Sequence, residues 1–396
     1  MNFSDFKFHS SLLEGLDSMG YTKPTPIQQQ TIPIIQQHKD IIACAQTGTG
    51  KTAAYLLPIL NKLSEKKSTD AYKINTIIIA PTRELALQID QQLEGFSYFI
   101  NVSSLPIYGG GDGAGFDQQK KALTKGADVI VATPGKLLSH LNLGYVDTSE
   151  LKHLVLDEAD RMLDMGFYDD IMKIINFLPK KRQTLLFSAT MPAKINTLAT
   201  RILINPEQVN IAISKPAAGI TQQAYMAFNN QKIHLIQHLL KETTFTSIII
   251  FSGSKSIVKE IEITLRKLGL AVKAIHSDLD QTDRENVLRD FKNRRLQVLV
   301  ATDILSRGID IEAIDLVINY DVPGSPEDYV HRIGRTARAS NKGLAITFIN
   351  EKDQQRFYRI EKLIETKIAK LNLPEAFGEG PKYEPEKRSK FFKKAK

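Results

Sequence analysis

Residues 40–52 read DIIACAQTGTGKT, in which a short apolar run leads into a glycine-rich segment and then into a helical pattern. A strand, a glycine loop and a helix in this order form a phosphate-binding loop, because backbone N–H groups and a helix N-terminus can then face phosphate oxygens. Lys51 is expected to reach the β- and γ-phosphates, and Thr52 is expected to ligate Mg²⁺. The stretch therefore predicts an α/β fold that binds a nucleotide.

Ala45 stands where the strict phosphate-loop pattern has its first glycine. The alternative interpretation, a glycine-rich turn with an incidental lysine, is disfavoured by the strand that precedes it. The residues expected to line the nucleotide are Ala45, Gln46, Thr47, Gly48, Thr49, Gly50, Lys51 and Thr52.

Runs rich in Ile and Val alternate with helical patterns along most of the chain, which is typical of parallel sheets with crossover helices. In the first half, strands are expected at 40–45, 74–80, 127–133, 153–158 and 183–190. In open α/β sheets, ligands bind beyond the carboxyl ends of the strands. The polar segments that end these strands are therefore expected to converge on one edge: AQTGTGKT, PTREL, TPGK, DEAD and SAT.

A second series of strands is expected at 247–253, 270–277, 296–302, 315–320 and 344–349, without a second GKT. Between the two series, the composition of NPEQVNIAISKPAAGI (205–220) indicates an extended connector. After about residue 371, Pro, Gly, Lys and Glu dominate, which is typical of disorder. The predicted organisation is a nucleotide-binding domain at 1–207, a linker at 208–219, a second domain at 220–370 and a basic disordered tail at 371–396.

Composition narrows the class of protein further. The 396 residues carry a formal charge of +8, which favours a polyanionic partner, and residues 380–396 hold seven Lys or Arg against two Glu. Cys44 is the single cysteine, so neither an intramolecular disulfide nor a cysteine-rich zinc site can form. Without a signal-peptide pattern or an apolar run near 18 residues, the expected location is cytoplasmic, with no membrane partner.

The segment VLDEAD (155–160) ends another apolar strand with adjacent carboxylates. Side chains alternate along a strand, so the two acids point in different directions and are expected to have separate roles. Asp157 is placed to hold Mg²⁺, partly through water, and Glu158 to orient or deprotonate an attacking water. The alternative is a solvated acidic strand end or helix N-terminus, which would be the usual interpretation of such a segment without a phosphate loop.

Eight segments, in this order and spacing, resemble the motifs of the DEAD-box ATP-dependent RNA helicases. They are GYTKPTPIQ (20–28), AQTGTGKT (45–52), PTREL (81–85), TPGK (133–136), DEAD (157–160), SAT (188–190), ATDILSRGID (301–310) and HRIGRTAR (331–338). The resemblance spans about residues 3–350 and is greatest to bacterial members, with a weaker likeness to the RhlE-type subgroup. It implies two tandem RecA-like parallel-sheet domains with an interdomain cleft, and ATP with Mg²⁺ as cofactors.

The same resemblance assigns residues to the rest of the ATP molecule. Gln28 would read the adenine edge, Arg307 would lie near adenine, and Asp310 would bind the ribose. Phe3 matches an isolated upstream aromatic, although a FxxFxF pattern also suits the protein core. Tyr21 and Lys23 lie in the adenine-reading segment.

Arg335 and Arg338 match the arginine fingers of the family. They would neutralise charge on the γ-phosphoryl group, a contribution of about 10³ to 10⁵ in rate. An arginine cluster by itself more often marks a solvated helix face. The resemblance also implies residues that couple ATP to RNA: Ser188, Thr190, His331 and Arg332.

The expected RNA contacts match backbone-binding positions and predict sequence-independent, salt-sensitive binding. They are Thr82, Arg83, Gly110, Thr133, Gly135, Lys136, Arg284 and Thr302. Two positions depart from the family, which usually has arginine at 136 and glycine at 337. Lys136 keeps the charge but loses the planar fork that grips phosphate, whereas Ala337 is a small change.

The expected function is an ATP-dependent RNA helicase that clamps single-stranded RNA, locally opens short RNA duplexes and hydrolyses ATP for release. One alternative is an ATP-gated RNA clamp or ribonucleoprotein assembly factor with little unwinding. A DNA-directed helicase and a scaffold with a degenerate ATP site are disfavoured by the intact motifs. Ribosomal or RNA-degradation proteins are candidate partners, and the tail KRSKFFKKAK could add loose RNA attraction or serve solubility alone.

Overall fold

The computed structural model describes residues 1–45, 48–65, 73–109, 113–211, 219–276, 278–302, 314–336 and 343–386. The chain forms two compact units, Met1–Ile213 and Ser214–Lys396.

The first unit is built on a seven-stranded sheet with the strand order β3-β4-β2-β5-β6-β1-β7. Neighbouring strands are parallel throughout, so their carboxyl ends all lie at one edge. The strands are β1 (Ile41–Cys44), β2 (Thr76–Ile79), β3 (Ser104–Ile107), β4 (Val129–Ala132), β5 (His153–Leu156), β6 (Gln183–Ser188) and β7 (Glu207–Asn210).

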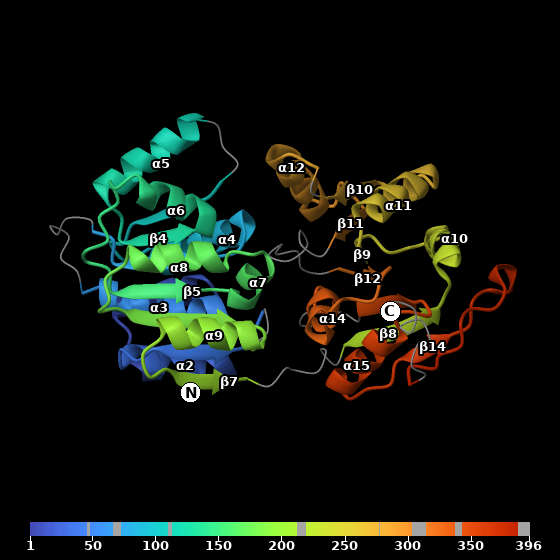
Figure 1. The fold of residues 1–396 in the computed structure, drawn as a ribbon, viewed down its shortest axis with the longest axis horizontal. Coiled ribbons are helices and arrows are strands. Elements are labelled where there is room, and N and C mark those ends of the chain that lie inside the picture. The colour runs from blue at the N-terminus through green and yellow to red at the C-terminus, as the bar shows by residue number, and fades with distance from the viewer. Residues whose placement is uncertain are drawn as a thin grey trace, which may run out of the picture. The chain divides into compact units, whose positions relative to one another are not determined.

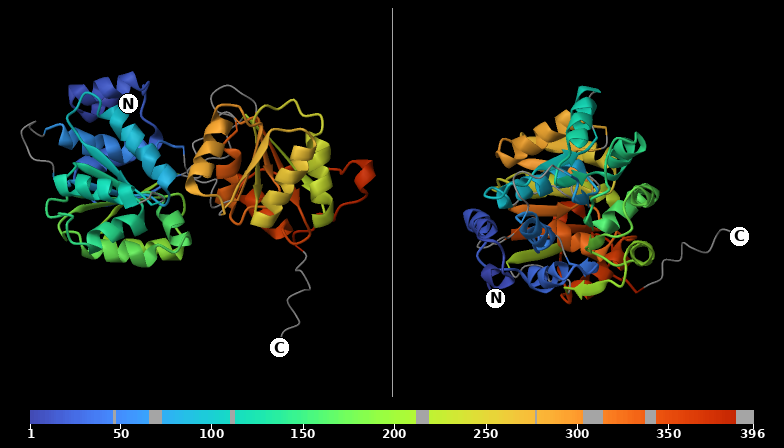
Figure 2. Two further views of the ribbon diagram at one scale, coloured as in Figure 1. Left: turned by 90° about the horizontal axis from the view of Figure 1, so that it is seen from above. Right: turned by 90° about the vertical axis from the view of Figure 1, so that its left-hand side faces the viewer.

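Helices cover both faces of this sheet, which explains why its central strands are apolar on both sides (Figures 1 and 2). One face carries η1 (Phe3–Phe6), α1 (Ser10–Ser18), α2 (Pro26–Gln36), α3 (Lys51–Leu63) and α4 (Arg83–Phe96). The other face carries α5 (Gly113–Lys125), α6 (Pro134–Asn142), α7 (Ala159–Asp164), α8 (Tyr168–Asn176) and α9 (Ala193–Ile202). Along β1, Ile41 and Ala43 enter the first core and Ile42 enters the second, as the alternation of strand side chains requires.

The second unit repeats this topology. Its seven parallel strands have the order β10-β11-β9-β12-β13-β8-β14, which matches the first sheet position by position. They are β8 (Ile220–Met226), β9 (Ile248–Ser252), β10 (Val272–Ile275), β11 (Val298–Thr302), β12 (Leu316–Asn319), β13 (Gly343–Ile349) and β14 (Ala369–Leu371). Among the described residues of this unit, the helices are α10 (Asn229–Leu240), α11 (Lys255–Lys267), α12 (Gln281–Lys292), α14 (Pro326–Ile333), α15 (Gln354–Ile364) and η2 (Glu375–Phe377).

The prediction of two parallel α/β sheets is confirmed, and each strand expected from the sequence is present. Four strands were not expected: β3, β7, β8 and β14. Three of them are edge strands, whose solvent-facing side chains weaken the apolar pattern. β3 also contains Pro106, which an edge tolerates because one side of the strand needs no ladder donor.

The predicted linker at 208–219 is wrong at its start. Residues Gln208, Val209 and Asn210 belong to β7, which pairs with β1 from Ile41↔Glu207 to Cys44↔Asn210. Val209 is buried in the first core. It is the one apolar residue of β7, whose other three residues are polar and exposed. The first unit therefore extends beyond residue 207.

The predicted disordered tail is wrong for residues 371–386. Leu371 pairs with Tyr225 in β14, and the segment that follows packs onto the second unit. Tyr383 Oη donates to a Glu361 carboxylate oxygen at 2.8 Å, and the Glu384 N–H donates to Gln354 Oε1 at 2.6 Å. These contacts with distant parts of the chain hold the segment on the second unit. The Pro- and Gly-rich composition alone does not reveal them.

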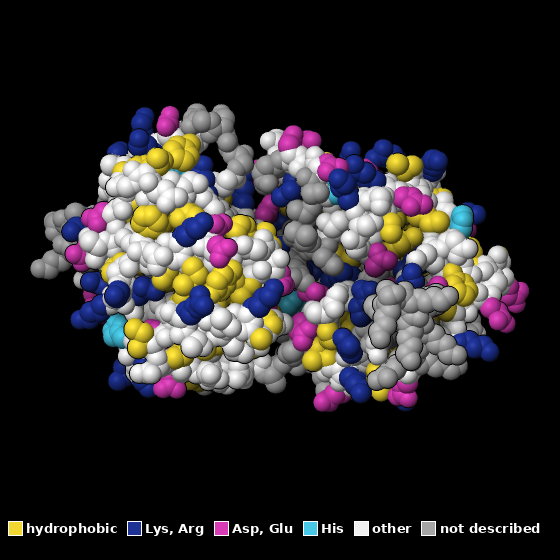
Figure 3. Space-filling model, viewed as in Figure 1, with side chains coloured by type: hydrophobic (Ala, Val, Ile, Leu, Met, Phe, Trp, Pro, Cys, Tyr) yellow, Lys and Arg dark blue, Asp and Glu magenta, His cyan; other side chains and the backbone are white. Residues whose placement is uncertain are grey.

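The described residues include no helix long and apolar enough to cross a membrane. On the face shown in Figure 3, Lys and Arg side chains are interspersed with Asp and Glu on both units.

Candidate active site

The polar segments predicted to converge do lie at one edge of the first sheet. β1, β2, β4, β5 and β6 are parallel and in register, and each is followed at its carboxyl end by one of the five segments. This edge is the position at which open α/β sheets bind ligands.

The phosphate loop connects β1 to α3. Gly48 and Gly50 have φ values of 77° and 89°, a left-handed conformation that glycine adopts without steric cost. Lys51 begins α3, is 6% exposed, and its Nζ donates to the Ala45 carbonyl at 2.7 Å. The lysine side chain thus connects the two ends of the loop. Gln46 and Thr47 lie outside the described residues.

Gln28, expected to read adenine, lies in the first turn of α2 and is 1% exposed. Its Oε1 accepts from the Thr25 N–H at 2.9 Å, and its Nε2 donates to the Gly50 carbonyl at 3.1 Å. A Cβ at Gly50 would lie 2.4 Å from this Nε2, so only glycine admits the contact. Gln28 therefore ties α2 to the phosphate loop, and its contact with adenine stays a prediction.

Asp157 is held by two donors at the end of β5. The Tyr55 hydroxyl donates to Oδ2 at 2.9 Å, and the Glu158 N–H donates to Oδ1 at 2.9 Å. Burial raises the pKa of Asp157 to about 6, against the opposing effect of Lys51, which lowers it. The Tyr55 hydroxyl also interacts with the Thr52 side chain, so one buried phenol contacts both side chains expected to hold Mg²⁺.

These residues suit Mg²⁺ chemically. The cation prefers oxygen ligands and is usually held by one or two protein groups together with substrate phosphates. Thr52 and Asp157 supply such oxygens, and the described residues contain no cluster of three or more metal-binding side chains.

Glu158 has a φ of 49°, a strained value for a non-glycine residue, and it forms the N-cap of α7. Its carboxylate pairs with Arg161 Nη1 at 3.1 Å, and the two side chains are 11% and 5% exposed. The alternating directions expected from the sequence are present, because Asp157 faces Tyr55 and Glu158 faces Arg161.

The DEAD and SAT segments are joined by Asp160. Its Oδ2 accepts from the Thr190 N–H at 2.9 Å and from the Thr190 hydroxyl at 2.8 Å. The Ser188 hydroxyl donates to the Thr190 carbonyl at 2.7 Å, and the Ala45 N–H donates to the Ser188 carbonyl at 3.0 Å. A continuous chain of hydrogen bonds thus runs from the phosphate loop through SAT to DEAD.

Three further residues of the expected adenine site lie near the N-terminus. Phe3 is 5% exposed and its ring packs against Phe6 and Tyr21, with centroids 6.3 and 6.4 Å apart. Tyr21 is half-buried and Lys23 is exposed. Phe3 is thus a core residue in this structure, and its role as a platform for adenine stays a prediction.

The expected RNA contacts of the first unit follow the same edge. Thr82 is the N-cap of α4, with its hydroxyl accepting from the Leu85 N–H at 3.3 Å, and Thr133 is the N-cap of α6. Gly135 is exposed and Lys136 is half-buried in the first turn of α6. Gly110 lies outside the described residues.

In the second unit, Arg332 is 5% exposed and serves an internal role. Its Nη1 donates to Asn319 Oδ1 at 2.9 Å and to the Asp321 carbonyl at 3.1 Å. These contacts join α14 to the end of β12, so any coupling by Arg332 acts through them. His331 and Arg335 are half-buried at the end of the same helix.

Thr302 ends β11, and Arg284 lies on α12; both are half-buried. Arg307, Asp310 and Arg338 lie outside the described residues.

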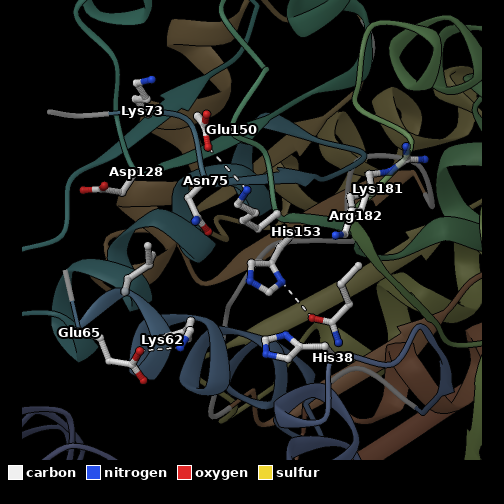
Figure 4. Close-up of a pocket in the computed structure, with 13 residues that line it drawn as sticks. His38, Lys62, Glu65, Lys73, Asn75, Asp128, Glu150, His153, Lys181 and Arg182 are labelled. Atoms are coloured by element: carbon white, nitrogen blue, oxygen red, sulfur yellow. Dashed lines mark hydrogen bonds and ion pairs between the residues drawn. The ribbon is translucent and has the colours of Figure 1, made fainter. Parts of the chain in front are cut away.

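A pocket of about 680 Å³ lies at the opposite, amino-terminal edge of the first sheet (Figure 4). Its lining includes Asn75, Asp128 and His153, which precede or begin strands. Much of its charge is paired, as in the Lys62–Glu65 contact of 2.5 Å. Because it lies at the opposite edge and no described residue of the phosphate loop lines it, this pocket is separate from the phosphate loop.

Sequence reasoning missed Tyr55, Arg161 and Asp160. A helical spacing was the available signal for two of them, because Tyr55 follows Thr52 by three residues and Arg161 follows Glu158 by three. The contact of Asp160 with Thr190 spans 30 residues and has no local signal.

A phosphate loop beside buried paired acids, on the first of two sheets with one shared topology, defines a nucleoside triphosphatase built from tandem RecA-like units. The DEAD/DEAH box helicase family model matches residues 25–198, and the helicase conserved C-terminal domain model matches residues 231–340. The chain belongs to the DEAD-box ATP-dependent RNA helicases, as the following relatives establish.

The DEAD-box ATP-dependent RNA helicase CshA of Bacillus subtilis is 41% identical over 375 residues, which cover 94% of this chain and 74% of the relative. The ATP-dependent RNA helicase CshA of Listeria monocytogenes is 40% identical, with 94% and 70% covered. Among solved structures, Dbp5 of S. cerevisiae bound to RNA and ADP BeF3 is 30% identical with a TM-score of 0.82, covering 93% of this chain and 95% of that one. The ATP-dependent RNA helicase function expected from the sequence is confirmed, while the narrower likeness to the RhlE-type subgroup stays a prediction.

Proposed function

We propose that this helicase clamps single-stranded RNA and opens short RNA duplexes locally in a cycle that ATP binding begins and hydrolysis ends. The observation that carries the hydrolytic part is the buried arrangement of Lys51, Asp157 and Glu158 at the carboxyl edge of the first sheet. An edge of this kind binds triphosphates and excludes bulk water from the acids.

In the proposed reaction, the phosphate loop binds the β- and γ-phosphates through its N–H groups and Lys51. Thr52 and Asp157 would hold Mg²⁺, which neutralises charge on the phosphate oxygens when bound. Glu158 orients the attacking water and accepts its proton, and Arg161 holds the Glu158 carboxylate in place.

The proposal assigns Arg335 and Arg338 of the second unit to the charge that develops on the γ-phosphoryl group. This assignment rests on the match of HRIGRTAR to the family motif. Arg335→Ala is expected to lower the RNA-stimulated ATPase rate by about 10³-fold or more, with nucleotide affinity retained. An Arg335→Ala variant with the wild-type rate would remove the residue from the mechanism.

Binding of ATP and RNA is proposed to be cooperative, because each ligand then favours the same conformation of the chain and raises affinity for the other. The chain of hydrogen bonds from Ala45 through Ser188 and Thr190 to Asp160 supports this coupling, since it connects the nucleotide loop to the SAT segment. RNA is proposed to bind along its backbone and therefore without sequence preference.

The deciding experiment measures ATPase rates without nucleic acid, with single-stranded RNA and with matched DNA, at one fixed salt concentration. Stimulation by RNA alone supports the proposal, and equal stimulation by DNA contradicts the choice of RNA. Strand release from a short RNA duplex then separates a helicase from an RNA clamp, because a pure clamp would hydrolyse ATP on RNA without releasing a strand.

A further inference from the structure

Two cations among the expected RNA contacts each lie over an aromatic ring. The Arg83 guanidinium carbon is 4.4 Å from the centroid of the Tyr108 ring, and Lys136 Nζ is 4.4 Å from that of the Phe116 ring. Tyr108 and Phe116 flank the glycine-rich residues 109–115, so one aromatic ring stands on each side of this stretch. Both distances are within the range of about 6 Å in which a cation is attracted to the face of a ring.

The two rings are connected through Gln119 and His140. Gln119 Nε2 donates to the Tyr108 carbonyl at 3.3 Å, and Gln119 Oε1 is 3.1 Å from His140 Nε2. The His140 ring stacks on Phe116, with centroids 4.4 Å apart and an interplanar angle of 12°. Residues of α5 and α6 thus form one scaffold with the end of β3.

The hydrogen bonds of this scaffold place a proton on His140 Nε2. Gln119 uses its amino group toward Tyr108, so its oxygen accepts the Nε2–H of His140. In the neutral ring, His140 Nδ1 accepts from the Tyr145 hydroxyl. Burial, together with the neighbouring charge of Lys136, lowers the pKa of His140 to about 4, so the ring adds no charge that would repel the lysine at neutral pH.

We propose that Tyr108 and Phe116 are positioning residues for RNA binding, which hold the Arg83 guanidinium and the Lys136 ammonium at the carboxyl edge of the first sheet. The inference rests on the proposed function in one respect, the contact of Arg83 and Lys136 with the RNA backbone.

The physical reason is strongest at position 136. A lysine ammonium is a point charge on a flexible stem, and ordering such a side chain on RNA costs conformational entropy. A ring beneath the ammonium restricts the stem before RNA arrives, so less entropy is lost on binding. Phe116 is itself held by His140, which is fully buried. The aromatic scaffold therefore offsets part of what the chain loses by having lysine rather than arginine there.

The test compares the affinity of the full chain for fluorescein-labelled single-stranded RNA, by anisotropy, in the presence of Mg²⁺ and a non-hydrolysable ATP analogue at one salt concentration. Phe116→Leu and Tyr108→Leu should each weaken RNA binding by about 2- to 5-fold, and leave the affinity for fluorescent ADP unchanged. In a Lys136→Ala background, Phe116→Leu should cause no further loss, because the residue acts through the lysine. The matched control is Tyr358→Leu, since Tyr358 pairs with Lys362 at 4.7 Å on α15, away from the expected RNA contacts.

Three outcomes would overturn the inference. RNA affinity of Phe116→Leu equal to wild type, with Lys136→Ala impaired, would show that the ring does not position the lysine. If Phe116→Leu weakens RNA binding as much in the Lys136→Ala background as in the wild type, Phe116 acts independently of the lysine. If Phe116→Leu lowers the thermal midpoint, Phe116→Tyr keeps the ring and should bind RNA as the wild type does; a loss there also contradicts the proposal.

Failure of the proposed RNA track has a different signature. In that case Arg83→Ala and Lys136→Ala would themselves bind RNA with wild-type affinity, whatever the aromatic variants do.

Discussion

The buried hydroxyl of Tyr55 donates a hydrogen bond of 2.9 Å to the Asp157 carboxylate, across the 102 residues that separate them in sequence. Tyr55 is fully buried, and the same hydroxyl interacts with the Thr52 side chain one turn earlier on α3. One phenol therefore sets the positions of the two oxygen-bearing side chains that we propose as the protein's contribution to Mg²⁺ binding. Side chains that hydrogen-bond to metal ligands commonly tune the affinity of the site for its metal.

Tyr55→Phe removes this hydroxyl without changing the ring. We expect the Mg²⁺ concentration for half-maximal binding of fluorescent ADP to rise by about 10-fold, because Thr52 and Asp157 lose their common partner. The control is Tyr329→Phe, which removes a buried hydroxyl that donates to Gln222 Oε1 at 2.9 Å in the second unit. An unchanged Mg²⁺ requirement in a folded Tyr55→Phe variant would contradict the positioning role.

Glu158→Gln should retain binding of ATP and RNA but slow hydrolysis by about 10²- to 10⁴-fold, because the amide cannot accept the proton of the attacking water. The stalled variant should hold RNA for longer in the presence of ATP. Single-turnover hydrolysis and RNA dissociation measure the two effects. The control is Glu207→Gln, which alters an exposed ion pair with Lys39. Normal turnover by Glu158→Gln would disprove the assignment.

His153 predicts a pH dependence of stability in the first unit. Burial lowers its pKa from 6.5 to about 4, and its Nδ1 lies 2.9 Å from Gln183 Oε1. The unfolded chain therefore binds the proton more tightly, and the free energy of unfolding falls as the pH drops from 6.5 toward 4, by up to about 1.4 kcal/mol per pH unit.

Urea unfolding at a series of pH values would measure this effect. His153→Asn cannot titrate in this range, so it should lose less stability on acidification than the wild type does. His234→Asn, at an exposed position on α10, should follow the wild type. Parallel curves for the wild type and His153→Asn would exclude the histidine as the cause.

The C-terminal segment predicts a separation between stability and RNA binding. Tyr383→Phe removes a hydrogen bond of 2.8 Å to the buried Glu361 and should lower the free energy of unfolding of the second unit by about 1–2 kcal/mol. Deletion of residues 387–396 should leave that stability unchanged and weaken RNA binding, most at low salt, because it removes six basic residues. Thermal unfolding and anisotropy at two salt concentrations test both; a destabilising deletion would contradict the division at residue 386.

Local patterns predicted most of the fold. The strands around Ile41, Ile77 and Val155 have a neighbouring strand on each side in a sheet covered on both faces, so they appear as uninterrupted apolar runs. β7 and β14 were missed because an edge strand has few apolar positions.

The site could be predicted where a motif joins a strand end, as with Lys51 and the acids of DEAD. It could not be predicted where a side chain contacts a residue on a different element. Gln28 bonding to the Gly50 carbonyl and Phe116 stacking on His140 are of this kind.

The sequence by itself determined the class of protein, the two parallel sheets and the edge at which the chemistry lies. It could do so because the periodicity of a buried strand and the residues at its carboxyl end are local properties, and a parallel sheet brings those ends together. Only the tertiary structure decided that Tyr55 donates to Asp157, that aromatic rings lie beneath Arg83 and Lys136, and that residues 371–386 pack onto the second unit. These contacts depend on which helix faces meet after the sheets have formed, and no spacing along the chain encodes that geometry.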